Sequence, residues 1–116
     1  AQDFSLGVIT VLGNLIDNAM DAVQNAPQKD IAVLLKATPS QWYFEIQDSG
    51  PGVNHEIIPH LFTRGFSTKG TGRGLGLFLV TKIIDKYDGN IEIAHHDPQG
   101  LVFKVTLSLP KKGELI

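Results

Sequence analysis

The sequence has no cysteine, which excludes disulfide bonds, thiolate zinc sites and a cysteine nucleophile. It has no large excess of either charge: the formal net charge is −2, and the scattered lysines and arginines give no basic surface for nucleic acid or anionic lipid. No continuous apolar run reaches the length of a membrane span, and the N-terminus lacks the features of a signal peptide. With 116 residues, 42% of them hydrophobic, the chain is predicted to form one globular domain over residues 1–116.

The segment from Leu12 to Val23 is the most informative part of the sequence. At about 100° per residue, its polar residues fall on one narrow face of a helix: Asn14, Asp17, Asn18 and Asp21. Its apolar residues fall on the opposite side: Leu12, Ile16, Ala19, Met20 and Val23. A solvated surface is the ordinary explanation of a polar face, but asparagine is a poor residue for a helix interior. The pattern therefore indicates oxygen ligands that face a cavity.

The remaining pattern predicts an α+β fold of two layers. The first helix is expected to run from Leu6 to Val23, with Asp3 or Ser5 as its N-cap. The other elements are expected in this order: strands over 31–37 and 42–47, a helical turn over 56–61, a helix over 75–87 that ends at Gly89, and strands over 91–95 and 101–109. Such an order favours a mixed, mostly antiparallel sheet with both helices packed on one face. The segment 53–72 has no sustained period and is predicted to be a flexible lid.

Two glycine-rich motifs can bind a ligand through backbone groups. Asp48 to Gly52 (DSGPG) follows a strand, so its carboxylate can accept a hydrogen bond from an amine while the glycines let a flat ring approach. A simple turn is the alternative for these five residues. Gly70 to Gly76 (GTGRGLG) opens the second helix, where free N–H groups and the positive end of the helix dipole favour phosphate. This motif matches neither a P-loop nor a dinucleotide fingerprint, and a flexible hinge is its alternative.

The order of these motifs resembles the GHKL superfamily, which is named for gyrase, the Hsp90 chaperones, histidine kinases and the MutL proteins, and which binds nucleotide in the Bergerat fold. NLIDNAMDA is similar to its N box, and DSGPG is similar to its G1 box. LFTRGFSTK is similar to its F box and the following lid, and GRGLGL to its G2 box. Four motifs in the same order, over about Leu12 to Pro110, make the resemblance specific.

Carried over by position, the resemblance implies ATP and Mg²⁺ as the ligands. Asn18 would give a carboxamide oxygen to Mg²⁺, Asn14 would lie near the phosphates, and these two residues are the implied catalytic pair. Asp48 would accept a hydrogen bond from the adenine amine. The implied ATP-binding residues are Asn14, Asn18, Asp21, Asp48, Gly50, Gly52, Lys69, Gly72, Arg73, Gly74, Leu75 and Gly76.

Asn14 separates the branches of this superfamily. Members that hydrolyse ATP have a glutamate at this position, which takes a proton from the attacking water, and an amide cannot do so. The resemblance therefore favours the histidine kinases, and FSTKGTGRGLGLFLV is similar to the citrate and C4-dicarboxylate sensor kinases. The implied function is transfer of the γ-phosphoryl group of Mg·ATP to a histidine in two-component signal transduction. The alternatives are an ATPase with Asp17 or Asp21 as its base, a protein-serine kinase, and a regulatory module that only binds nucleotide.

The four histidines of the chain do not resemble a phosphoacceptor site. His55 is followed by Glu56, but no long helix surrounds it, and His60, His95 and His96 lie in loops or at strand ends. The histidine-bearing dimerisation domain is therefore expected to be absent from this chain and to be its partner, together with a downstream response regulator. The resemblance places the domain in the cytoplasm, as part of a membrane-bound sensor.

Overall fold

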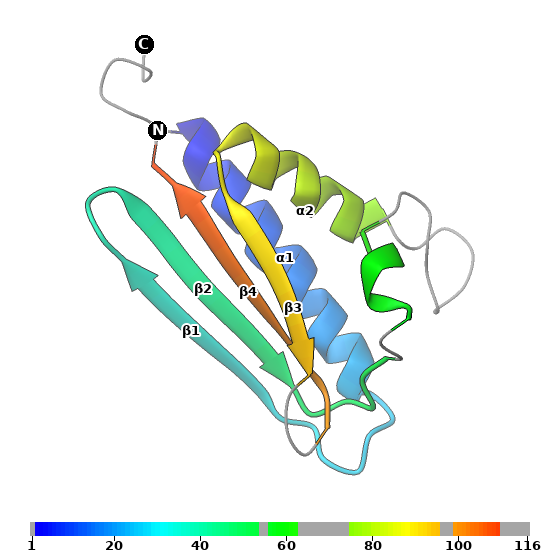
Figure 1. Cartoon of the computed structure of the whole chain (residues 1–116). Coiled ribbons are helices and arrows are strands. Elements are labelled where there is room, and N and C mark those ends of the chain that lie inside the picture. The colour runs from blue at the N-terminus through cyan, green and yellow to red at the C-terminus, as the bar shows by residue number, and fades with distance from the viewer. Residues whose placement is uncertain (1, 54–55, 63–74, 96–98, 110–116) are drawn as a thin grey trace.

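The computed structural model describes residues 2–53, 56–62, 75–95 and 99–109. Its elements are α1 (Gln2–Val23), β1 (Ile31–Ala37), β2 (Gln41–Asp48), the 3-10 helix η1 (Ile58–His60), α2 (Leu75–Lys86), β3 (Asn90–His95) and β4 (Leu101–Ser108). Figure 1 shows α1 and α2 side by side in one layer and the strands in the other. The predicted α+β fold of two layers is confirmed, and the elements follow one another in the predicted order.

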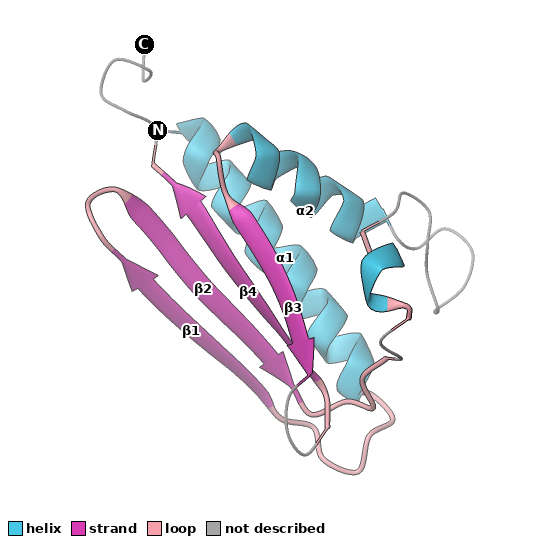
Figure 2. Cartoon of the chain, viewed as in Figure 1, coloured by secondary structure: helices cyan, strands magenta, loops and turns pink. Residues whose placement is uncertain are grey.

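The described strands form one sheet, drawn in magenta in Figure 2, with the order β1-β2-β4-β3. β1 and β2 form an antiparallel hairpin, in which Leu35 pairs with Phe44. β4 lies between β2 and β3 and runs antiparallel to both. The described strands thus contain only the antiparallel pairings of the expected mixed sheet, and the second strands of the two hairpins, β2 and β4, are neighbours.

The core lies between this sheet and the helices. Alternate residues of β2 and β4 face the helix layer and are buried: Phe44, Ile46, Phe103, Val105 and Leu107. Buried residues of α1 and α2 meet them: Val8, Val11, Leu15, Ala19, Val80 and Ile84. The same alternation turns the side chain of Asp48, the last residue of β2, toward the helix layer, where it is 4% exposed. A carboxylate is thereby fixed at one end of the core.

α1 differs from its prediction in two ways. The helix begins at Gln2, so neither Asp3 nor Ser5 is its N-cap. Its buried stripe is turned toward Asn14, because α1 packs against α2 as well as β2. As a result Met20, a residue of the predicted apolar face, is 55% exposed.

Within α1, the stretch Phe4–Val23 is long and apolar enough to cross a membrane by length and composition alone. In this fold one side of the stretch lies in the core, where Val11 and Leu15 near its centre have no exposed surface. Leu6 and Ile9 lie on its outer side and are exposed. The apolar composition of α1 therefore follows largely from packing against two partners.

α2 ends in a Schellman turn. The N–H of Gly89 donates to the carbonyl of Ile84 at 2.8 Å, and the N–H of Asp88 donates to the carbonyl of Asp85 at 3.4 Å. Asp88, rather than Gly89, has the left-handed backbone, with a φ of 48°. The glycine has a different role, because a Cβ on Gly89 would overlap the carbonyl oxygen of Thr106 in β4. The helix ends near its predicted residue, and Gly89 lets it approach the sheet.

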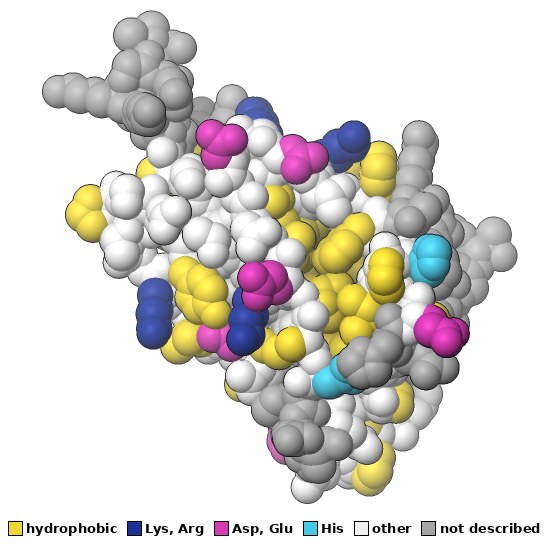
Figure 3. All heavy atoms as spheres, in the orientation of Figure 1, with side chains coloured by type: hydrophobic (Ala, Val, Ile, Leu, Met, Phe, Trp, Pro, Cys, Tyr) yellow, Lys and Arg dark blue, Asp and Glu magenta, His cyan; other side chains and the backbone are white. Residues whose placement is uncertain are grey.

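The helix layer leaves parts of the sheet uncovered. On the side drawn in Figure 3, hydrophobic side chains gather in a hollow between β3, α2 and η1, and Ile83, Ile91 and Ile93 of these elements are only partly buried. At the other edge, Val33 and Leu35 of β1 are about half exposed, because β1 lies beyond the helices. The well-covered part of the sheet is therefore β2 and β4, which carry the candidate site at their end.

Candidate functional site

Asp48 is the central charged residue of the candidate site. Its Oδ1 accepts the N–H of Gly50 at 2.9 Å and the N–H of Leu101 at 3.4 Å. Both donors are backbone groups, one in the loop that follows β2 and the other at the start of β4. Because a carboxylate can accept several hydrogen bonds at once, a buried carboxylate held in this way is suited to recognising an amine donor.

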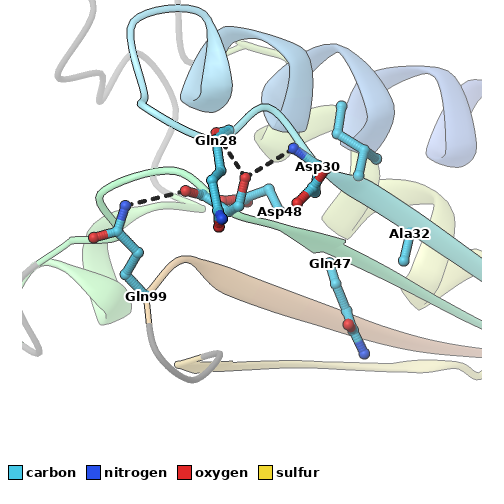
Figure 4. Close-up of a pocket in the computed structure, with 8 residues that line it drawn as sticks. Gln28, Asp30, Ala32, Gln47, Asp48 and Gln99 are labelled. Atoms are coloured by element: carbon cyan, nitrogen blue, oxygen red, sulfur yellow. Dashed lines mark hydrogen bonds between the residues drawn. The ribbon is translucent and has the colours of Figure 1, made fainter.

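Ser49 ties the loop after β2 to the loop before β1. Its Oγ donates to the carbonyl of Gln28 at 2.8 Å and accepts the N–H of Asp30 at 2.8 Å. The N–H of Ser49 also donates to the carbonyl of Asp30 at 3.0 Å. Figure 4 shows these residues on the wall of a polar pocket of about 250 Å³ at the ends of β1 and β2. The serine thus fixes the backbone on which Asp48 lies.

Gly50 and Gly52 shape this loop, and Gly50 lets it turn close to α1. A Cβ on Gly50 would lie 2.6 Å from the carbonyl oxygen of Ala22, in the last turn of the helix. Gly52 has a φ of 73°, which residues with a side chain adopt only with strain. Both glycines of the DSGPG motif therefore stand where a side chain would displace the loop.

Asn14 and Gly76 bring the start of α2 against the middle of α1. Asn14 is half-buried, and its Nδ2 donates to the carbonyl of Thr10 at 2.8 Å. A Cβ on Gly76 would lie 2.5 Å from Oδ1 of Asn14. The first turn of α2 therefore lies beside this asparagine, at the positive end of the helix dipole. The structure thus brings together two motifs that are about 60 residues apart in the sequence.

Asn18 and Asp21 follow Asn14 along the same flank of α1. Both are half-buried, whereas Asp17 is exposed, so the four residues of the predicted polar face do not share one environment. Among the described residues, no three His, Asp or Glu side chains come together as metal ligands. Asn18 offers a cation an amide oxygen, which is a ligand type that Mg²⁺ accepts.

Several residues with predicted roles lie outside the described part of the chain: Lys69, Gly72, Arg73 and Gly74. Leu75 is the first residue of α2. Of the predicted lid over 53–72, the structure describes Val53 and residues 56–62, which include η1. Among the histidines, His60 lies in η1 and His95 ends β3, while His55 and His96 lie outside the described residues.

Three residues that no sequence motif indicates, Gln99, Gly100 and Leu101, contact the DSGPG loop from a distant part of the chain. The Nε2 of Gln99 donates to the carbonyl of Ser49 at 3.2 Å. Gly100 has a φ of 111°, and a Cβ there would overlap the carbonyl of Asp48. In the sequence Gly100 is only a turn glycine, since its contact with Asp48 depends on the pairing of β2 with β4.

Comparison with known proteins finds relatives over nearly the whole chain. The family described as histidine kinase-, DNA gyrase B-, and HSP90-like ATPase matches residues 5–111. The sensor histidine kinase DcuS of Escherichia coli K12 is 35% identical over 114 residues, which are 98% of this chain and 21% of that protein. The sensor protein CitS of Bacillus subtilis is 39% identical over 107 residues, 92% of this chain and 19% of that protein. The chain thus spans about a fifth of the length of these curated relatives.

Solved structures of histidine kinases have the same fold. A mycobacterial sensor histidine kinase, MprB, superposes with a TM-score of 0.76 and 28% identity, over 90% of this chain and 71% of that one. The catalytic domain of the histidine kinase ThkA gives a TM-score of 0.76 and 28% identity, over 89% of this chain and 66% of that one. The family match, the fold and the buried Asp48 at the end of β2 agree, and the chain belongs to the family of histidine kinase-, DNA gyrase B- and HSP90-like ATPases.

Proposed function

We propose that this domain binds Mg·ATP and donates the γ-phosphoryl group to a histidine on a separate dimerisation domain. The observation that carries the proposal is Asp48, a buried carboxylate on the helix side of the sheet that is held by two backbone N–H groups. The relatives support it, because DcuS is named a sensor histidine kinase and the ThkA structure is that of a histidine kinase catalytic domain.

The base of the nucleotide is recognised by Asp48. Its carboxylate accepts a hydrogen bond from the exocyclic amine of adenine, and guanine presents a carbonyl oxygen at the equivalent position, which repels a carboxylate. The resemblance gives Gly50 and Gly52 a place beside the flat ring, and Gly50 also lets the loop that carries Asp48 pack against Ala22. The site should therefore bind ATP more tightly than GTP.

The phosphates are held between α1 and the start of α2. The first turn of α2 lies beside Asn14, so its N–H groups would face phosphates bound there, and Lys69 and Arg73 of the predicted lid and G2 box would add positive charge. Asn18 would hold Mg²⁺ through its carboxamide oxygen. A bound Mg²⁺ supplies positive charge that bridges the phosphate oxygens and offsets the charge that develops during transfer.

Transfer to a protein acceptor is favoured over hydrolysis because of Asn14. Its amide group donates to the carbonyl of Thr10 and has no basic atom that could take a proton from water. Asp17 is exposed, which leaves Asp21 as the half-buried carboxylate that an ATPase mechanism would use. Steady phosphate release that is lost in Asp21→Asn would favour the ATPase over the kinase.

The domain would act in two-component signalling, in the cytoplasm. Its direct partner would be the phosphoaccepting histidine domain of the same kinase, and a response regulator would receive the phosphoryl group afterwards. The resemblance to the citrate and C4-dicarboxylate sensor kinases agrees with the names of the relatives, which include a probable C4-dicarboxylate sensor kinase of Bacillus subtilis at 36% identity. The signal belongs to a part of the kinase outside this domain.

Calorimetric titration with ATP, with and without Mg²⁺, tests the binding step. The wild-type domain should bind ATP saturably, and more weakly without the metal. Asp48→Asn should weaken binding about 10- to 100-fold, because a hydrogen bond to a charged group is lost. Asp85→Asn, a change of the same kind on the exposed side of α2, is the matched control and should bind like the wild type. A folded wild-type domain that binds no ATP would contradict the proposal.

Labelled ATP and the cognate histidine domain test the transfer step. The label should appear on the acceptor as acid-labile phosphohistidine. Acid-stable phosphate would instead indicate a serine kinase. The absence of any transfer between two folded domains, with ATP binding intact, would indicate a regulatory module.

A further inference from the structure

The carboxylate of Asp48 is held from two distant parts of the chain. One part is its own loop, through the N–H of Gly50 at 2.9 Å, and the other is the start of β4, through the N–H of Leu101 at 3.4 Å. The second donor lies directly after Gly100. The position of the carboxylate therefore depends on how closely the segment Gln99–Leu101 approaches the end of β2.

Gly100 makes this approach possible. Its φ is 111°, a backbone conformation that residues with a side chain rarely adopt. A Cβ at this position would overlap the carbonyl oxygen of Asp48 and would lie 3.1 Å from its Oδ1. Any side chain here would therefore push the segment and the end of β2 apart, and the N–H of Leu101 would move away from the carboxylate.

Two further hydrogen bonds hold the same parts together. The Nε2 of Gln99 donates to the carbonyl of Ser49 at 3.2 Å, as Figure 4 shows. At the end of β3, Nε2 of His95 lies 2.8 Å from the carbonyl oxygen of Val53, so this ring nitrogen carries the hydrogen. The loop from Asp48 to Val53 is thus attached to the end of the β3–β4 hairpin at its first two residues and at its last.

We propose that Gly100 is a positioning residue for base recognition, and that the segment Gln99–Leu101 sets the preference of the site for adenine by fixing the carboxylate of Asp48. The inference rests on the proposed function, in which Asp48 accepts the adenine amine. A site selects a hydrogen-bonding group strongly only when its own polar group is held in position. Without Gly100, the carboxylate would remain but would discriminate less between the amine of adenine and the carbonyl of guanine.

The test compares the binding of Mg·ATP, Mg·GTP and inorganic triphosphate by calorimetry. Gly100→Ala should reduce the ratio of ATP to GTP affinity about tenfold, because the acceptor is displaced. Gln99→Ala removes one hydrogen bond from an exposed side chain without adding bulk, so it should fold and should reduce the same ratio several-fold. The affinity for triphosphate should not change in either variant, since the phosphates bind elsewhere.

Gly13→Ala is the matched control, because Gly13 is exposed on α1 and a Cβ there would have nothing within 4 Å. It should keep the wild-type ratio. If Gly100→Ala does not fold, Gln99→Ala decides the question alone. An unchanged ratio in every variant that folds would overturn the inference, and so would equal losses for all three ligands, which indicate general damage. A wild-type domain without preference for ATP would instead contradict the proposed function itself.

Discussion

The two halves of the fold are held together by different kinds of contact. In one half, which we call the aromatic half (Phe4, Trp42 and Tyr87), rings pack edge to face: the Phe4 ring centroid lies 6.2 Å from that of Trp42 and 5.1 Å from that of Tyr87. In the other, the site half (Asn14, Asp48, Gly50, Gly76 and Gly100), backbone groups and polar side chains make the contacts. The same two helices cover both halves, so the difference lies in the residues and not in the architecture.

The glycines of the aromatic half serve packing. A Cβ on Gly7 would lie 3.1 Å from side-chain carbons of both Ile83 and Tyr87, so the glycine brings α1 and α2 into contact. In the site half, Gly76 meets the amide oxygen of Asn14, and Gly100 meets the backbone of Asp48. Glycine therefore lets apolar groups touch in one half and places hydrogen-bonding groups in the other. From this comparison we expect stability and ligand binding to depend on different residues.

The largest expected effect is on stability, in the aromatic half. Phe4→Ala should lower the free energy of unfolding by about 3–5 kcal/mol, because Phe4 is 4% exposed and a cavity would remain between Trp42 and Tyr87. The folded fraction should bind Mg·ATP with the wild-type dissociation constant. Urea denaturation and calorimetry measure the two quantities. Phe4→Leu, a smaller loss of volume, should give a smaller change, and a parallel loss of ATP affinity would show that the halves are coupled.

The next effect is on binding, in the site half. Gly76→Ala should weaken Mg·ATP binding about tenfold, because the new Cβ displaces the start of α2 from Asn14 and, in the proposed function, moves the N–H groups that would bind the phosphates. The affinity for adenosine, which has no phosphate, should stay the same. Titrations with the two ligands distinguish these outcomes. Equal losses for both would place Gly76 in the structural framework and not beside the phosphates.

Much of this arrangement could be predicted from the sequence, because local patterns report local structure. Periodicity predicted the described helices and strands in their order. The motifs predicted Asn14, Asp48 and Gly76 as members of one nucleotide site; the structure places Gly76 against Asn14, and the shared site stays a prediction. Met20 was assigned to the wrong environment, since periodicity defines an apolar side but not the angle at which two partners, α2 and β2, cover it. Likewise, the left-handed residue after α2 is Asp88, although Gly89 is the expected type.

The contact of Gly100 with Asp48 could not be predicted for a different reason. It requires β4 to lie beside β2, and the sequence alone gives two hairpins without saying how they join. In the register of the sheet, Gln47 pairs with Val102, and this pairing brings the residues before Leu101 to the end of β2. Contacts of this kind depend on topology, and they are the ones on which the base-recognition inference depends.

A smaller effect, of the opposite sign, is expected on the outer side of α1. Gly13→Ala should raise the free energy of unfolding by up to about 1 kcal/mol, because alanine is a better helix former and loses less backbone entropy. Gly13 is exposed and has open space around it, so the change introduces no overlap. Thermal and urea denaturation would measure the gain. A decrease in stability would mean that the helix bends at Gly13 for a reason that its surroundings do not reveal.

The smallest effect at neutral pH concerns Tyr43, which lies next to the aromatic half on the face of the sheet away from the helices. The pKa of Tyr43 is raised from 10.0 to about 12. The largest cause is the hydrogen bond from its hydroxyl to Oε2 of Glu45 at 2.7 Å, and the smaller causes are partial burial and the negative charges of Glu45 and Glu92. The unfolded chain then loses this proton at lower pH than the folded one, so the stabilisation is complete below about pH 10 and is lost as the pH rises toward 12.

Comparison of the wild type with Tyr43→Phe isolates this contribution. Between about pH 9 and pH 11, the free energy of unfolding should fall more steeply for the wild type, because the variant lacks the titrating hydroxyl. The ATP dissociation constant at about pH 9 should be the same for both, since Tyr43 faces away from the helix layer that carries the site. Equal slopes would show that the hydrogen bond to Glu45 does not persist in solution. A change in ATP affinity would instead show that the outer face of the sheet influences the site half, so that stability and ligand binding do not depend on separate residues.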